Sequence, residues 1–157
     1  MACNSLGLVL QKEEKSIEAE HMFQEGLDVS SNMGETWIMQ QSLVNLGFSK
    51  FALGETAEAQ TCFLRALRMA SETNLIPCIL DSLAGMAWIY AGQKREEVAL
   101  ELTMLVEKHP VVTQETKGRV MQLHAQLETR LTSTQIELIQ DRAGTKTVET
   151  FVEKLLG

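Results

Sequence analysis

The sequence predicts an all-α fold built from antiparallel helix pairs, and three observations lead to this prediction. Strong helix formers such as Leu, Ala, Glu, Gln and Met dominate the 157 residues, while proline occurs only twice. A pattern of small and apolar residues recurs at a fixed spacing. Residues suited to caps and turns interrupt the helical periodicity at intervals. The expected architecture is a right-handed α-α superhelix with C-terminal capping helices.

The internal repeat is clearest between the first two copies, in which the pattern recurs 40 positions later. The matched positions are Leu6-Gly7 with Leu46-Gly47, Ala19 with Ala59, Phe23 with Phe63, and Leu27 with Leu67. A third copy aligns at an offset of 38, which matches Gly85 to Gly47 and Gly92 to Gly54 but then requires one inserted residue. A glycine within a helix costs about 1 kcal/mol relative to alanine. Gly47 and Gly85 therefore predict that two helices approach closely at these positions.

Caps and helix breakers divide the chain into a series of expected helices. Gly34 and Gly54 follow apolar-periodic segments, and Pro110 follows another, so each marks the end of a helix. Pro77 suits the first turn of a helix, where its missing N–H would be unpaired anyway. The expected helices are 1–12, 16–30, 35–53, 56–71, 77–91, 94–108 and 112–131, followed by Thr134–Arg142 and Lys146–Leu156.

These helices group into repeats at residues 1–33, 34–74 and 75–111, with a further helix at 112–131. Residues 132–157 lack the repeat pattern, and we expect their two helices to cap the array with one polar face. The first copy of the pattern begins only a few residues into the chain. We therefore expect a fragment of a longer protein, with an apolar N-terminal edge that permits self-association.

At these residues the chain resembles the tetratricopeptide repeat. That pattern runs Leu-Gly in the first helix, Gly at the turn, and Ala, an aromatic residue and Ala-Leu in the second helix. Lys50 departs from the pattern, which usually has tyrosine at this position. The long period and the tail around Ala143-Gly144 resemble the C-terminal helical arrays of large bacterial signal-transduction ATPases of the STAND type, which include maltose-responsive transcription activators. This second resemblance implies a sensor or inducer-binding arm.

The repeat resemblance also implies a groove lined by the first helices of successive repeats. The implied groove residues are Gln41, Val44, Phe48, Phe51, Ser82, Met86, Ile89 and Tyr90. Such a surface is apolar with a few amides and hydroxyls, which suits a protein, an apolar peptide or a small-molecule inducer. The same residues at helical spacing also fit a core between repeats. Trp37, at the start of its helix, is the large aromatic residue that we expect to be exposed.

Composition excludes several classes of partner. The net charge of −7 and the scattered lysines and arginines disfavour direct binding of nucleic acid. No apolar run approaches the roughly 20 residues that span a bilayer, so we expect no membrane partner. The three cysteines occupy apolar helical positions, as buried thiols do in a reducing compartment, and the chain is therefore predicted to be cytoplasmic.

No combination of residues predicts catalysis, a metal site or a cofactor. His21, His109 and His124 are far apart in sequence and lack a second ligand at helical spacing. Cys62 lies beside Phe63 in an apolar helix, which favours an inert thiol. Two non-catalytic functions stay open: a regulatory arm of a larger signalling ATPase or transcription regulator, and a free-standing adaptor. An enzyme would require a converging cluster of titratable groups.

Overall fold

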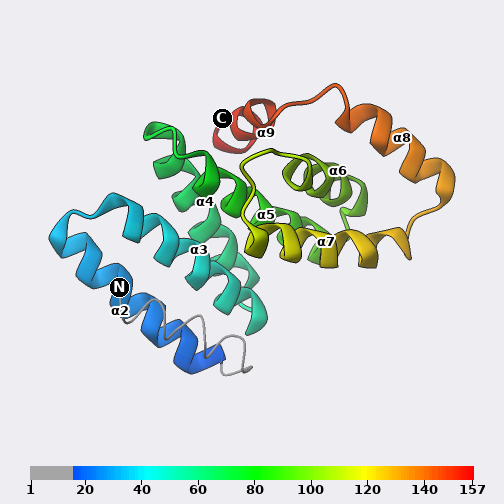
Figure 1. The fold of residues 1–157 in the computed structure, drawn as a ribbon. Helices are drawn as coiled ribbons and strands as arrows, with labels where there is room; N and C mark the ends of the chain where they lie inside the picture. The colour runs from blue at the N-terminus through cyan, green and yellow to red at the C-terminus, as the bar shows by residue number, and fades with distance from the viewer. Residues whose placement is uncertain (1–15) are drawn as a thin grey trace. The chain divides into compact units, whose positions relative to one another are not determined.

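The computed structural model describes residues 16–157, and all regular secondary structure in this range is helical (Figure 1). The helices are α2 (Ser16–Met33), α3 (Thr36–Ala52), α4 (Thr56–Glu72), α5 (Ile76–Gly92), α6 (Glu96–Glu107), α7 (Gln114–Glu128), α8 (Ser133–Ala143) and α9 (Val148–Leu156). The predicted all-α fold is confirmed. The helix expected at 1–12 and the Leu6-Gly7 pair lie outside the described residues. Between residues 16 and 157 none of the helices has the length and apolarity needed to cross a membrane.

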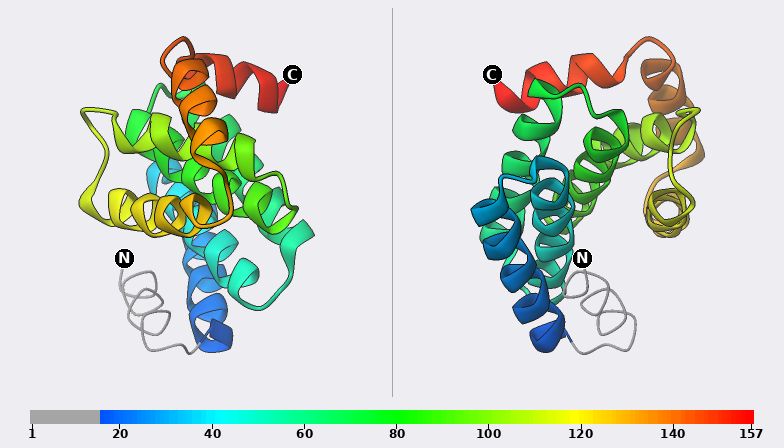
Figure 2. Two further views of the ribbon diagram at one scale, coloured as in Figure 1. Left: turned by 90° about the vertical axis from the view of Figure 1, so that its right-hand side faces the viewer. Right: turned by 60° about the vertical axis from the view of Figure 1, so that its left-hand side comes forward.

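The chain divides into two compact units, of which the first ends at Asn74 and the second begins at Leu75. In the first unit α3 packs on both α2 and α4, and Figure 2 shows these helices from further directions. Their shared core is mainly apolar, and Gln40, Ser42 and Asn45 of α3 are buried as well. Its largest fully buried side chains are Phe23, Leu43, Phe63 and Leu67.

Helices α3 and α4 approach closely where Gly47 of α3 meets Phe63 of α4. A Cβ atom placed on Gly47 would lie 2.7 Å from Cε1 of Phe63, and the Phe63 ring is fully buried. The ring also packs edge-on against Phe48, with centroids 4.9 Å apart and an interplanar angle of 69°. Phe63 is therefore held from two sides and cannot easily yield. The prediction that Gly47 marks a helix crossing is confirmed.

One turn geometry recurs every 20 residues along the repeats. Gly34, Gly54, Asn74 and Lys94 all have positive φ angles, of 71°, 81°, 51° and 59°. In three of these turns the next backbone N–H donates to a carbonyl five residues earlier, as in a Schellman motif. These bonds run from Glu35 to Ser30 (3.0 Å), from Glu55 to Lys50 (2.9 Å) and from Arg95 to Tyr90 (2.9 Å). The helices that follow, α3 to α6, begin without a side-chain cap.

These turns correct the alignment of the third copy. Lys94, and not Gly92, is the counterpart of Gly54, because Gly92 is still the last residue of α5. The repeat therefore keeps an offset of 40 throughout and needs no inserted residue. The offset of 38 was wrong because it assigned the turn to a glycine, whereas this turn holds a lysine in the left-handed conformation.

In the second unit α5 packs on α6 and α7, and both α8 and α9 pack on α6. Three helices of this unit begin differently from the repeat helices. Thr113, Thr132 and Thr147 cap α7, α8 and α9 through their side chains, and Thr132 forms a full capping box with Gln135. The regular turn is thus confined to the repeats.

We expect Gly47→Ala to destabilise the protein. The added methyl group meets the fixed Phe63 ring, and such overpacking costs about 1–3 kcal/mol. This cost outweighs the gain of about 1 kcal/mol in helix propensity. Gly118→Ala is the matched control, because Gly118 lies within α7 with nothing within 4 Å of its Cβ position, and it should stabilise by about 1 kcal/mol. Urea unfolding followed by circular dichroism measures both, and a Gly47→Ala protein as stable as wild type would contradict the packing argument.

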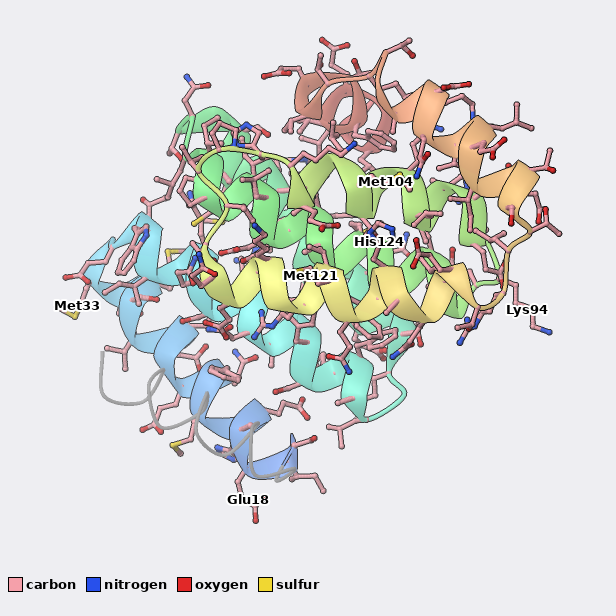
Figure 3. All side chains as sticks on the ribbon, turned by 45° about the vertical axis from the view of Figure 1, so that its right-hand side comes forward. Glu18, Met33, Lys94, Met104, Met121 and His124 are labelled. Carbon is pink, nitrogen blue, oxygen red and sulfur yellow. The ribbon has the colours of Figure 1, made fainter. Side chains whose placement is uncertain are left out.

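Lys94→Gly should stabilise the protein by about 1 kcal/mol, because a left-handed conformation costs a non-glycine residue about that amount. The Lys94 side chain projects into solvent, so the change removes little packing (Figure 3). Lys108→Gly is the control, since Lys108 has an ordinary φ of −83° at the end of α6. Thermal unfolding should show opposite shifts for the two variants, and shifts of the same sign would reject the explanation.

Candidate interaction surface

In the first unit, the residues that correspond to the implied groove form a stripe along α3, the first helix of its repeat. Its members are spaced four, three, four and three positions apart, so they lie along one side of the helix. They are Trp37, Gln41, Val44, Phe48 and Phe51. Trp37 is 55% exposed, as predicted, whereas Val44 is buried. Gln41, Phe48 and Phe51 are half-buried, so the accessible surface is mainly aromatic with one amide.

On α5 the residues predicted to line the groove are largely in the core. Ser82, Met86 and Ile89 are fully buried, and the Ser82 hydroxyl donates to the Cys78 carbonyl at 2.8 Å. Tyr90 is also buried, with the Arg95 guanidinium 4.5 Å from its ring centroid. Thirteen of the seventeen residues of α5 are buried, so these positions contribute to the core of the second unit instead of an open groove.

The corrected offset of 40 gives α5 a different face. The counterparts of Gln41, Val44, Phe48 and Phe51 are Asp81, Ala84, Trp88 and Ala91. Trp88 is half-buried, as Phe48 is. The signal that identifies these residues is the 20-residue spacing of the turns, which a search restricted to glycine misses.

Polar groups join α5 to α7 on the same side of the second unit. The Thr116 hydroxyl donates to the buried Asp81 carboxylate and accepts from the Thr113 hydroxyl at 2.9 Å. Arg119 pairs with Glu115 at 2.9 Å. Removal of the Arg119 guanidinium from water lowers its pKa, while Glu115 and Asp81 oppose that shift and keep the group charged. The polar groups between α5 and α7 are thus paired with one another.

A cavity of about 290 Å³ opens in the first unit between α2, α3 and α4. Its lining residues are Gln24, Leu27, Leu43, Leu46, Lys50, Glu58, Thr61, Cys62 and Arg65. Lys50 stands where the repeat pattern has tyrosine, and its ammonium pairs with Glu20 at 2.7 Å and Glu55 at 2.8 Å. These two carboxylates raise the pKa of Lys50. An aromatic ring at this position would fill space that the thin lysine chain leaves open.

No group of three potential metal ligands occurs among residues 16–157. His124 contacts Glu107 at 2.8 Å and Glu128 at 3.4 Å, which makes a surface ion pair when the imidazole is protonated. The Cys62 thiol is nearly closed to solvent, and burial raises its pKa, so it is a poor nucleophile.

A comparison with protein families agrees with three features described above: the repeat period, the helix pairs and the contact of Gly47 with Phe63. Residues 38–102 match the tetratricopeptide repeat family. The match covers nearly all of α3, all of α4 and α5, and the first half of α6. Comparisons with curated proteins and with solved structures give no match. The predicted tetratricopeptide array is thus supported for this segment, and tetratricopeptide domains are protein-interaction modules.

The raised pKa of Cys62 predicts a dependence of stability on pH. The thiol ionises at a higher pH in the folded chain than in the unfolded chain. Just above the ordinary thiol pKa, the unfolded chain has therefore lost this proton while the folded chain still holds it. The free energy of unfolding should fall as the pH rises through this window. Cys62→Ala should reduce the slope of stability against pH between about 8 and 10. Equal slopes for the two proteins, measured by urea unfolding, would show that Cys62 does not contribute.

Proposed function

We propose that this chain is a non-catalytic binding module that holds a partner protein, as a peptide or a helix, on the first-helix face of its tetratricopeptide array. The observation that carries the proposal is the exposed Trp37, which ends a stripe completed by the half-buried Gln41, Phe48 and Phe51. Aromatic side chains of this kind contribute most of the energy in protein interfaces, because they bury a large area with little loss of side-chain freedom.

The chemistry of this stripe restricts the partner. It offers aromatic surface and one amide, and Lys50, the nearest cation on α3, is already paired with two carboxylates. The expected ligand is therefore an apolar segment that places aliphatic or aromatic side chains along α3.

At a finer level we propose that the array is the regulatory arm of a larger signalling ATPase or transcription regulator. In that setting residues 1–131 supply the repeats and residues 132–157 the terminal cover. The bound partner or a small-molecule inducer then acts by favouring one conformation over another. A free-standing cytoplasmic adaptor is the alternative. The reading frame upstream of Met1 distinguishes them, since an in-frame nucleotide-binding motif supports the regulatory arm and a nearby stop codon supports the adaptor.

Selection of peptides from a random phage-displayed library on the immobilised chain tests the binding face. Selected peptides should be rich in aliphatic and aromatic residues. Their affinity, measured by fluorescence anisotropy, should fall by about 2 kcal/mol for Trp37→Ala, since truncation of an aromatic anchor costs about that much. Trp37 is more than half exposed, so the variant should remain folded.

Leu138→Ala is the matched control for this measurement. Leu138 is 59% exposed on α8, so its truncation also removes an exposed apolar side chain but leaves α3 unchanged. Peptide affinity should be the same as for wild type. If Trp37→Ala and Leu138→Ala affect every selected peptide equally, the α3 stripe is not the binding face.

A further inference from the structure

The C-terminal segment, residues 132–157, is attached to the second unit by few buried side chains. Both of its helices pack on α6. Ile139 is the one buried residue of α8, and Val148 and Phe151 are those of α9. By contrast, seven of the twelve residues of α6 are buried. A segment with so few buried apolar contacts opens at a much lower free energy than the core beneath it.

Two ion pairs also hold the C-terminal segment on α6. Glu97 and Glu101 lie one helical turn apart on α6, and they meet Arg142 and Lys146 of the segment. Arg142 Nη2 lies 3.0 Å from Glu97 Oε2, with both side chains about half exposed. Lys146 Nζ lies 2.7 Å from Glu101 Oε1, and the Glu101 side chain is only 4% exposed. The second pair is therefore the one shielded from water.

Burial of the Glu101 carboxylate costs desolvation free energy, which a segment that served only to cover the core would not require. Within the described part of the chain, Glu101 Oε1 has no polar partner beyond the Lys146 ammonium. An apolar residue at this position would stabilise the contact as well or better, because burial of an ion pair removes most of its benefit. What the acid adds is selectivity, since the face accepts a basic segment and rejects a neutral or acidic one.

The position of Lys146, the basic partner of Glu101, allows this ion pair to break without loss of a helix. Lys146 lies in the connection between α8 and α9, and its ammonium is 5.5 Å from the centroid of the Phe151 ring. One residue thus links the ion pair to the apolar anchor of α9. Because Lys146 is outside both helices, withdrawal of this group does not require either helix to unfold.

We propose that this face of α6 is a docking site for a partner protein and that the C-terminal segment is its displaceable occupant. The partner is an amphipathic helix with an apolar side and two basic side chains one turn apart, which match Glu97 and Glu101. Its binding would release α8 and α9. This surface is separate from the α3 stripe, so the inference does not depend on the proposed function.

The test uses the full chain and a fluorescein-labelled peptide of residues 132–157 as the competing segment. Wild type should bind the peptide weakly, because its own segment occupies the face. Phe151→Ala in the chain should raise the apparent affinity for the peptide at least about tenfold. Loss of the Phe151 ring weakens the attachment of the chain's own segment, so the site is unoccupied in a larger fraction of molecules. Addition of Glu101→Gln to that chain should remove the gain. Lys154→Ala, an exposed residue of α9, is the control and should behave as wild type.

Circular dichroism must first show that Phe151→Ala keeps its helical content, and if it does not, Lys146→Gln in the chain takes its place. Peptide affinity equal to that of wild type in the folded variant would overturn the proposal, because the segment would then be a fixed cap. So would a gain that Glu101→Gln leaves intact. Light scattering that showed a wild-type dimer dissociated by the peptide would assign the face to a second copy of the chain and likewise overturn it.

Discussion

Helix α4 brings the ring of Phe63 against the backbone of α3 at Gly47, and the first unit depends on this crossing. A side chain at position 47 would hold the helices apart, and Phe63 would lose its place against Phe48. At an offset of 40 the third copy has Ala87 and Thr103 at these two positions, and both are fully buried. Ala87 is larger than Gly47 and Thr103 is smaller than Phe63, so the two changes in volume oppose each other.

Much of the fold could be predicted from the sequence because its signals are local. Helix formers, breakers and a 40-residue repeat placed every described helix end within three residues of its position. The left-handed residue of the turn after α5 was misassigned to Gly92, because Lys94 adopts a backbone conformation that is usually associated with glycine. Nothing in the composition of that segment indicates such strain, and Gly92 offered a more conventional assignment.

The residues selected on α3 form a partly accessible stripe, whereas those selected on α5 are buried, because the number of helices that pack on an element cannot be read from its own sequence. Helix α5 packs on both α6 and α7, and thirteen of its seventeen residues are buried. Ser82 and Met86 therefore lie in the core, and so does Ala84, which takes the place of Ser82 at the corrected offset. The ion pairs of Glu97 and Glu101 on α6 could not be predicted from the sequence either. Their partners lie 45 positions further along the chain, and no local pattern connects them.

The turns at Gly34, Gly54, Asn74 and Lys94 have a consequence for how such a chain can change in length. Each joint holds backbone hydrogen bonds and leads into a helix without a side-chain cap, and α3, α4 and α5 all have 17 residues. A block cut between two equivalent joints therefore ends in the same geometry at which the next block begins. Genetic duplication or loss of one block would leave every remaining connection intact, so the array can grow or shrink without redesign of its junctions.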